Sequence, residues 1–170
     1  MNQFIPGWYL IYTKPKQENK TAYHLSLMNI EHYLPIIKTM RQWHDRKKII
    51  DQPIFPSYVF VKIQDTKELQ YGMEADGACY YIKFGQQLAK VSQMVIDQIK
   101  LVVGSGQGIS VSTDAFKPGQ KVIIKEGGLM GLRAEVVKHN GKKKILVRVQ
   151  LLNSNLLVDL PSNYLLESAL

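Results

Sequence analysis

The sequence predicts an α+β fold in which helices flank a mainly antiparallel sheet, followed by a small all-β barrel of the SH3 type. Up to about residue 104, β-rich segments are interleaved with segments of helical periodicity, which is typical of a sheet covered by helices. Residues 105–116 are rich in Gly, Ser and Thr, the composition of a flexible linker. Residues 117–170 then hold only short β-rich segments separated by turn residues. We therefore predict a domain over 1–104, a linker over 105–116 and a barrel over 117–170.

Composition narrows the class of protein before any motif is considered. The 170 residues carry a net charge of +8 and a single Cys, which excludes an internal disulfide framework and fits a reducing compartment. No stretch approaches the roughly 20 apolar residues needed to cross a bilayer, and the N-terminal residues lack the pattern of a secretion signal. We expect a cytoplasmic protein whose positive charge suits a polyanionic partner.

The chain opens with a predicted strand over Trp8–Thr13. Pro15 fits the first turn of a helix that should run to about Met28, with Ala22, Leu25 and Met28 facing the core. Polar and basic residues gather around the start of this helix: Lys14, Lys16, Gln17, Lys20 and His24. They form either a solvated helix face or a surface that contacts phosphates and bases.

The stretch Pro53–Ile63 organises the first domain. Two prolines, which lack a backbone donor, stand at its entry, and Tyr58–Ile63 has the β-branched and aromatic composition of a strand. Its rings either pack into the core or form a docking surface, because aromatic residues anchor many interfaces.

Between these strands, Ile30–Thr39 reads as a second strand and Met40–Ile50 as a hairpin whose tip is Asp45–Lys48. Basic residues surround Trp43 and His44 in this hairpin: Arg41, Arg46, Lys47 and Lys48. Basic and aromatic residues together can bind nucleic acid, and a solvated hairpin tip is the alternative.

The remaining elements follow from periodicity and turn chemistry. We predict a helix over Thr66–Met73, a strand over Cys79–Phe84 and a helix from the N-cap Ser92 to Val103. In the second domain, Asn140-Gly141 indicates a type I′ hairpin turn. The predicted barrel strands are Val122–Lys125, Ala134–His139, Ile145–Val149 and Leu156–Leu160.

No catalytic constellation is found in the sequence. The four His residues lack metal-ligand spacing, and Cys79 is interpreted as a small core residue rather than a nucleophile. We expect a binding protein that is not an enzyme and that uses no cofactor or metal.

Four motifs in the right order resemble the NusG family. The run Phe-Pro-Ser-Tyr-Val-Phe-Val (55–61) follows a Trp8-Tyr9-x-x-Tyr12 strand, as in the N-terminal NGN domain of that family. The runs Lys-Pro-Gly-Gln-Lys-Val (117–122) and Glu-Gly-Gly-Leu-Met-Gly (126–131) resemble its KOW domain. The resemblance covers roughly residues 7–168.

The resemblance implies a transcription elongation or antitermination factor that binds RNA polymerase and suppresses pausing or termination. An apolar patch would dock on the clamp helices of the largest subunit: Tyr12, Phe55, Tyr58 and Phe60. A second contact would fall near Leu69–Gly72. The non-template DNA strand would meet Lys14, Lys16, Gln17, Lys20 and His24. A ribosomal protein or the termination factor Rho would contact the KOW domain at Leu129, Met130 and Leu132.

Within the family, the chain most resembles the specialised RfaH-like and UpxY-type antiterminators of capsular polysaccharide operons. The short N-terminus, the basic first helix and the loss of the KOW aromatic, where Leu132 stands, favour this choice. The alternatives are a general elongation factor and a ribosome-associated KOW protein that binds RNA. We expect a monomer, and the β-branched content of the second domain predicts that it stays β.

Overall fold

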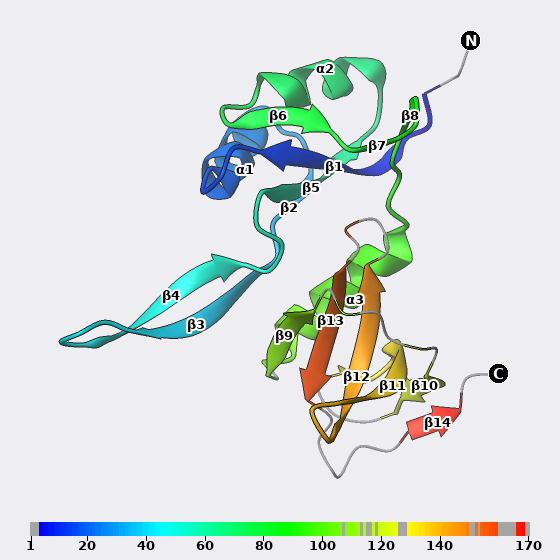
Figure 1. The fold of residues 1–170 in the computed structure, drawn as a ribbon. Helices are drawn as coiled ribbons and strands as arrows, with labels where there is room; N and C mark the ends of the chain where they lie inside the picture. The colour runs from blue at the N-terminus through cyan, green and yellow to red at the C-terminus, as the bar shows by residue number, and fades with distance from the viewer. Residues whose placement is uncertain are drawn as a thin grey trace. The chain divides into compact units, whose positions relative to one another are not determined.

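The computed structural model describes residues 4–106, 108–112, 114, 117, 119–125, 129–149, 152, 154–159 and 166–168. The chain divides into two compact units, Met1–Gln93 and Met94–Leu170. Each unit is described by itself (Figure 1).

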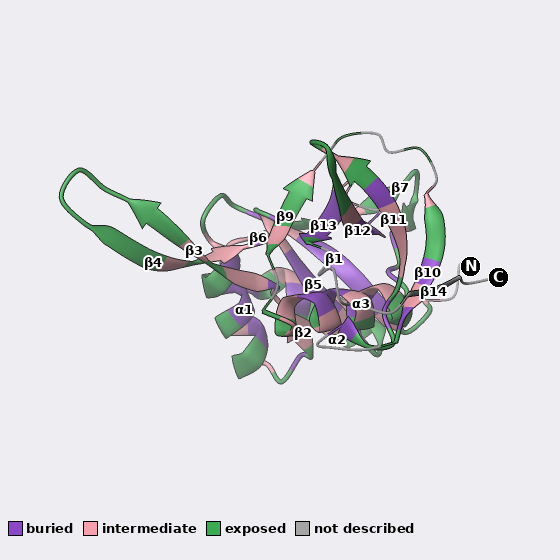
Figure 2. Cartoon of the chain, turned by 90° about the horizontal axis from the view of Figure 1, so that it is seen from below, coloured by how far each residue is buried: buried purple, intermediate pink, exposed green. Residues whose placement is uncertain are grey.

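The first unit is built on a four-stranded antiparallel sheet in the order β2-β5-β1-β6. Two helices accompany it, α1 (Glu18–Leu27) and α2 (Thr66–Glu74). The strands are β1 (Gly7–Thr13), β2 (His32–Tyr33), β5 (Tyr58–Ile63) and β6 (Ala78–Tyr81). The apolar sequence of β1 and β5 is explained by this order, because both are central strands and are buried along most of their length (Figure 2).

One face of this sheet forms a core with the two helices. Ile11, Val59 and Val61 belong to one buried cluster with Leu25 of α1, and Leu69 of α2 packs against it. The side-chain alternation of the strands therefore sends Tyr12, Tyr58 and Phe60 to the opposite face.

Two hairpins complete the first unit. The longer one, which we call the arm, pairs β3 (Ile36–Gln42) with β4 (Lys47–Pro53). It extends away from the four-stranded sheet (Figure 1) and is exposed along most of its length (Figure 2). The shorter hairpin pairs β7 (Lys83–Phe84) with β8 (Gln87–Leu88).

The second unit holds a six-stranded antiparallel sheet in the order β14-β10-β11-β12-β13-β9. Asn140 and Gly141, which join β11 to β12, have φ angles of 50° and 76°, as a type I′ turn requires. Gln98 of α3 (Gln93–Gly104) donates a 2.8 Å hydrogen bond to the carbonyl oxygen of Arg133. The strands are β9 (Ile109–Ser112), β10 (Gln120–Ile124), β11 (Arg133–His139), β12 (Lys142–Val149), β13 (Ser154–Asp159) and β14 (Leu166–Ser168).

The α+β class is confirmed, with antiparallel sheets and, in the described residues, three helices. Several boundaries differ from the prediction. Helix α1 begins at Glu18 instead of near Pro15, because Lys16 has a φ of 61° and cannot be helical. Pro35 separates β2 from β3, so Ile30–Thr39 is not one strand. The predicted strand Cys79–Phe84 is likewise interrupted at Ile82.

The division into two units also falls elsewhere than the predicted one. It lies at the start of α3, between Gln93 and Met94, and not after residue 104. Within the predicted linker 105–116, Ile109–Ser112 form β9 and pair with β13. The composition of the segment did not predict this strand, because Gly, Ser and Thr surround only two apolar β-branched residues, Ile109 and Val111.

Candidate functional site

Three tyrosines lie in one row across the sheet of the first unit. Tyr12 in β1 is directly opposite Tyr58 in β5 on one side and Tyr80 in β6 on the other. The rings of Tyr12 and Tyr80 stack with centroids 5.0 Å apart, and the ring of Tyr58 meets Tyr12 edge-on at 5.5 Å. Tyr80 is 53% exposed and the other two are half-buried. We call Tyr12, Tyr58 and Tyr80 the tyrosine row.

A turn before β5 holds Tyr58 in place. Ser57 has a left-handed φ of 65°, and its carbonyl oxygen accepts a 2.8 Å hydrogen bond from the amide of Thr13. Its own amide donates a 2.7 Å bond to Oε1 of Glu18, a side chain that is only 6% exposed. The buried carboxylate therefore ties the first turn of α1 to the entry of β5, which fixes one end of the tyrosine row.

The tyrosine row is apolar in character although it carries three hydroxyl groups. Burial, and then the proximity of Tyr80 and Tyr12, raises the pKa of Tyr58. That phenol is therefore neutral at physiological pH, where its ordinary pKa is already near 10. Neutral rings with a polar edge are well suited to a partly wet protein interface.

Two of the four rings predicted for the docking patch are not accessible. Phe55 is 3% exposed and Phe60 0%, and they pack edge-on with ring centroids 6.0 Å apart. The prediction that these rings lie at the surface is wrong, because the neighbours of Phe60 include Phe55 and Tyr33, which stacks at 6.3 Å. The accessible part of the patch is the tyrosine row, and the sequence argument did not include Tyr80.

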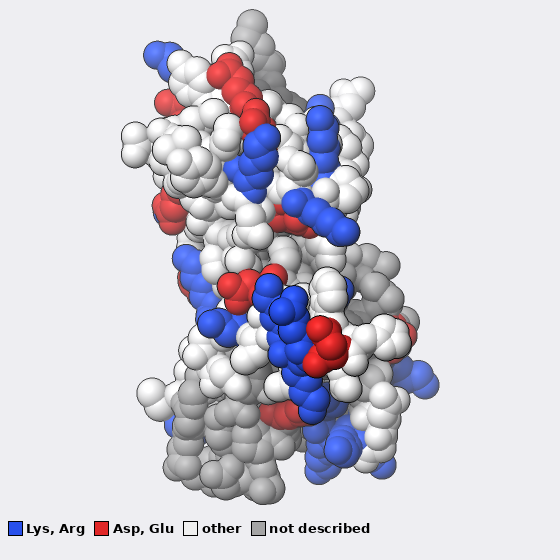
Figure 3. Space-filling view, turned by 90° about the vertical axis from the view of Figure 1, so that its left-hand side faces the viewer, with Lys and Arg blue, Asp and Glu red and all other residues white. Residues whose placement is uncertain are grey.

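The basic residues at the start of α1 are close in space, but they do not share one helix face. Lys14 and Lys16 are exposed and precede the helix, whereas Lys20 and His24 lie on it and Gln17 stands at its N-cap position without a side-chain capping bond. Figure 3 looks from the side toward which the arm extends, and it shows Lys and Arg side chains dispersed among acidic and uncharged ones.

One acidic side chain partly neutralises this basic group. Nζ of Lys20 lies 2.9 Å from Oδ2 of Asp76, and Nε2 of His24 lies 3.8 Å from the same oxygen. The hydrogen bond from Lys20 is the main reason why the pKa of Asp76 is lowered. Lys14 and Lys16 are therefore better placed than Lys20 to meet a phosphate.

The predicted contact residues of the second unit differ in accessibility. Leu129 is 0% exposed and Leu132 is 1% exposed, so these two are core residues. Met130 between them is 64% exposed. The backbone explains the difference, because Leu132 donates to the carbonyl oxygen of Leu129 at 3.0 Å and closes a turn that has Met130 at its crest. Residues 126–128 of the predicted Gly-rich turn lie outside the described residues.

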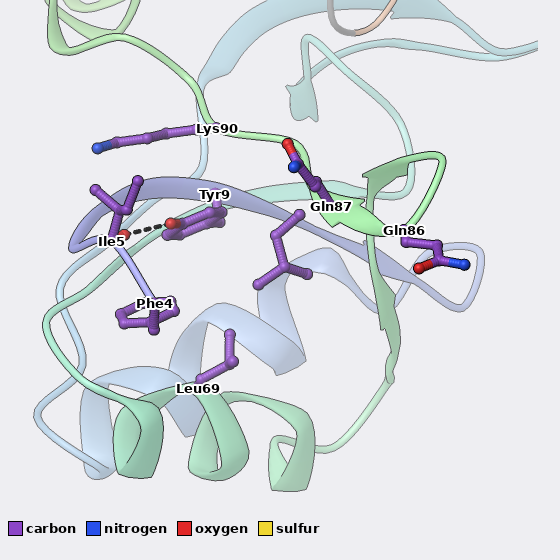
Figure 4. Close-up of a pocket in the computed structure, with 8 residues that line it drawn as sticks. Phe4, Ile5, Tyr9, Leu69, Gln86, Gln87 and Lys90 are labelled. Carbon is purple, nitrogen blue, oxygen red and sulfur yellow. Dashed lines mark hydrogen bonds between the residues drawn. The ribbon is translucent and has the colours of Figure 1, made fainter. Parts of the chain in front are cut away.

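A cavity of about 490 Å³ lies in the first unit between the start of β1, helix α2 and the β7–β8 hairpin (Figure 4). Its lining is mostly apolar with amides and one amine: Phe4, Ile5, Tyr9, Leu69, Gln86, Gln87, Leu88 and Lys90. The hydroxyl of Tyr9 donates to the carbonyl oxygen of Ile5, and burial raises its pKa. The lining does not combine a nucleophile with a general base that could activate it.

The described part of the chain gives little support for a metal site or a membrane-spanning helix. No group of three His, Cys, Asp or Glu there could hold a metal ion. No helix found in that part is long and apolar enough to span a membrane. Cys79 is exposed in β6. The prediction of a core cysteine is therefore wrong, and the reason is a bulge: Tyr12 pairs with Tyr80 and Thr13 with Ala78, which leaves Cys79 out of the ladder.

Comparison with known families decides what kind of protein carries this site. The family model described as transcription termination factor nusG matches residues 6–100, more than half of the 170-residue chain. The chain belongs to the NusG family. NusG proteins are transcription factors and not enzymes, and the match covers the tyrosine row, the arm and α1.

Solved structures of NusG relatives resemble the chain more distantly. The structure of the domain interaction in Thermotoga maritima NusG is 17% identical, with 91% of this chain and 93% of that chain covered and a TM-score of 0.49. The MjSpt4:Spt5 complex in conformation A is 12% identical, with 94% and 91% covered and a TM-score of 0.31.

Proposed function

We propose that this NusG-family protein binds RNA polymerase through the tyrosine row and suppresses pausing or termination. The observation that carries the proposal is the contiguous group of rings formed by Tyr12, Tyr58 and Tyr80 in the NGN part of the chain, of which Tyr80 is exposed and the other two are half-buried. The clamp helices of the largest polymerase subunit are the proposed partner, with a second contact near Leu69–Gly72.

The energy for docking comes from burial of the rings. Apolar surface removed from water contributes about 25 cal/mol per Å², and a well-packed aromatic anchor is commonly worth about 2 kcal/mol. Because the row is held by the Glu18–Ser57 hydrogen bond and by ring stacking, little side-chain entropy remains to be lost on binding. Docking alone would hold the factor on the polymerase.

Contacts to the displaced non-template strand are proposed for Lys14, Lys16, Gln17, Lys20 and His24. Such contacts add affinity that falls with salt, because each neutralised phosphate releases counterions. They would also give an operon-specific factor its selectivity. We place the protein with the specialised antiterminators, acting as a monomer in the cytoplasm, and a general elongation factor is the alternative.

Residues 117–170 of the second unit are proposed to be a KOW domain with an SH3-like barrel. Its exposed Met130 is the best candidate among the three predicted residues for contact with a ribosomal protein or Rho. A ribosome-associated role is the second candidate function, because the β11–β12 hairpin carries exposed lysines at its end: Lys138, Lys142 and Lys143.

Substitution of Tyr58 tests polymerase docking. Tyr58→Ala should weaken binding to immobilised RNA polymerase about thirtyfold, the equivalent of roughly 2 kcal/mol for one anchor ring. The matched control is Tyr23→Ala, which removes a ring of the same kind that is 61% exposed on α1 and outside the row. Circular dichroism checks that both variants are folded.

Two outcomes would contradict the proposal. The first is unchanged polymerase binding by folded Tyr58→Ala protein. The second is co-purification of the wild-type chain with ribosomal subunits in place of polymerase, which would favour the ribosome-associated role.

A further inference from the structure

The register of the arm sorts its side chains onto two faces. Arg41 is paired with Lys48, and the next pair toward the base, Met40 with Ile49, points to the other side. At the tip, the amide of Trp43 donates a 2.8 Å hydrogen bond to the carbonyl oxygen of Arg46. This bond continues the ladder by one step and places Trp43 and Arg46 on the same face as Arg41 and Lys48.

One face of the arm therefore gathers three cations around an indole ring: Arg41, Arg46, Lys48 and Trp43. We call these four residues the tip surface. Trp43 is 60% exposed, and the three basic side chains are exposed as well. None of the four makes an ion pair with any other described residue.

The opposite face has a different character. It carries Met40 and Ile49, which are 66% and 62% exposed, between the pairs Lys38–Asp51 and Gln42–Lys47. Over residues 36–53 the arm has five Lys and Arg against two Asp, a net charge of +3. The positive charge that has no acidic partner across the ladder is concentrated on the tip surface.

We propose that the tip surface binds single-stranded nucleic acid, with Trp43 stacked on a base and Arg41, Arg46 and Lys48 on the flanking phosphates. Charge complementarity selects a polyanion. The exposed ring selects a strand with unpaired bases, because an indole can stack only on a base face that is free. A duplex hides those faces and would leave Trp43 in water.

This surface is separate from the basic group at the start of α1 and does not depend on polymerase docking. It lies on β3, β4 and the turn between them, a hairpin that projects from the sheet (Figure 1). The test therefore uses the whole chain without polymerase.

The experiment measures binding of fluorescein-labelled dT20, U20 and a blunt 20-base-pair duplex by anisotropy at several salt concentrations. Trp43→Ala should weaken binding to the single strands about tenfold, within the range for loss of one stacked base. Arg41→Gln combined with Lys48→Gln should weaken it further at low salt and reduce the slope of log affinity against log salt by about 1.4, which is roughly 0.7 for each lost phosphate contact.

The matched control is Lys38→Gln combined with Lys47→Gln, which removes the same charge from the opposite face of the same arm. It should change the affinity less than threefold. Quenching of tryptophan fluorescence by dT20 should disappear in Trp43→Ala, because the other indole, Trp8, is 2% exposed.

The outcomes separate clearly. Preferential binding of either single strand, with loss in the tip variants only, supports the proposal, and the ratio of dT20 to U20 affinity identifies DNA or RNA as the natural strand. Equal weakening by the two double variants, retained quenching without Trp43, or tighter binding of the duplex would each overturn it.

Discussion

Tyr81 has a buried hydroxyl group for which the described residues offer no hydrogen-bond partner. The residue is 7% exposed and belongs to the core cluster of the first unit. Burial is the main reason why its pKa is raised far above the ordinary tyrosine value. Gly72 of α2 lies against this hydroxyl so closely that a Cβ there would collide with it. An unpaired buried hydroxyl costs free energy without any compensating bond.

Tyr81→Phe should therefore leave the first unit as stable as before or more stable by about 1 kcal/mol, because it removes only the unpaired group. The measurement is urea unfolding followed by tryptophan fluorescence, since both Trp8 and Trp43 belong to the first unit. Tyr9→Phe is the matched control in the same cluster. It loses the bond to the carbonyl oxygen of Ile5 and should be destabilised by about 1 kcal/mol.

A greater loss of stability in Tyr81→Phe than in Tyr9→Phe would contradict this account.

The tyrosine row shows how far single residues can be predicted from the sequence. Tyr12 and Tyr58 could be proposed because they stand in motifs with a recognisable order. Tyr80 could not, because nothing local in Cys-Tyr-Tyr-Ile says that β6 pairs with β1 or that a bulge sets its register. Burial of Phe55 was equally hidden, since an aromatic residue at a strand entry has the same sequence signature whether it is covered or exposed.

At the scale of elements, one ion pair joins β11, β12 and the residue before β10 in the second unit. Glu135 in β11 accepts from Nε and Nη2 of Arg148 in β12 at 2.8 and 2.9 Å. Its Oε2 also accepts from the amide of Gly119, just before β10, at 2.9 Å. The hydrogen bond from Arg148 is the main reason why the pKa of Glu135 is lowered.

This pair should make the second unit sensitive to acid. Because the pKa of Glu135 is lowered on folding, its contribution to stability is complete above the ordinary value near 4.5. The contribution is lost as the pH falls through the lower, folded pKa. Glu135→Gln should cost about 1 kcal/mol or more at pH 7 and flatten the pH dependence below 4.5. Urea unfolding followed by far-ultraviolet circular dichroism at pH 7 and pH 3 measures both effects.

The control is Asp159→Asn. The carboxylate of Asp159 pairs with Lys144, and the Asp159 side chain is 60% exposed. Exposed pairs contribute little, so its effect at pH 7 should stay below about 0.5 kcal/mol. An equal loss in the two variants would show that the bidentate pair has no special role.

Strands with strong alternation or a clear turn were predictable as elements, and those broken by tertiary context were not. The β11–β12 hairpin follows from local chemistry, as Asn140 and Gly141 illustrate. A hairpin was also predicted for the arm, but its turn lies at Trp43–Arg46 and not at Asp45–Lys48, because Lys47 and Lys48 pair within the ladder. Strand β9 gains its structure from pairing with β13, which lies more than 40 residues away, and no composition rule contains that partner.

At the scale of the whole molecule, two compact units share an excess of positive charge. The net charge of +8 favours nucleic acid as a partner without choosing a sequence. Docking through the tyrosine row would be the same on every gene, because the polymerase surface does not change. Any preference for particular genes must therefore come from contacts with nucleic acid.

Chromosome-wide immunoprecipitation tests whether docking and gene preference come from different contacts. A specialised paralogue should occupy a few transcription units, and Tyr58→Ala protein should be lost from all of them. Occupancy of most transcribed genes would show that the protein is a general elongation factor. The family was predictable from the motifs of the first domain, and the α+β class from the alternation of strand-like and helical segments. The choice between a general and a specialised paralogue could not be predicted, because it depends on the target nucleic-acid sequence, which cannot be read from the protein sequence.

Cys79 has a practical consequence. It is the single thiol of the chain, it is exposed, and it is the residue next to Tyr80. A maleimide dye or a photoactivatable crosslinker attached to it would report from the rim of the tyrosine row, with no need to remove other cysteines. Crosslinking from Cys79 would identify the partner surface that the rings contact.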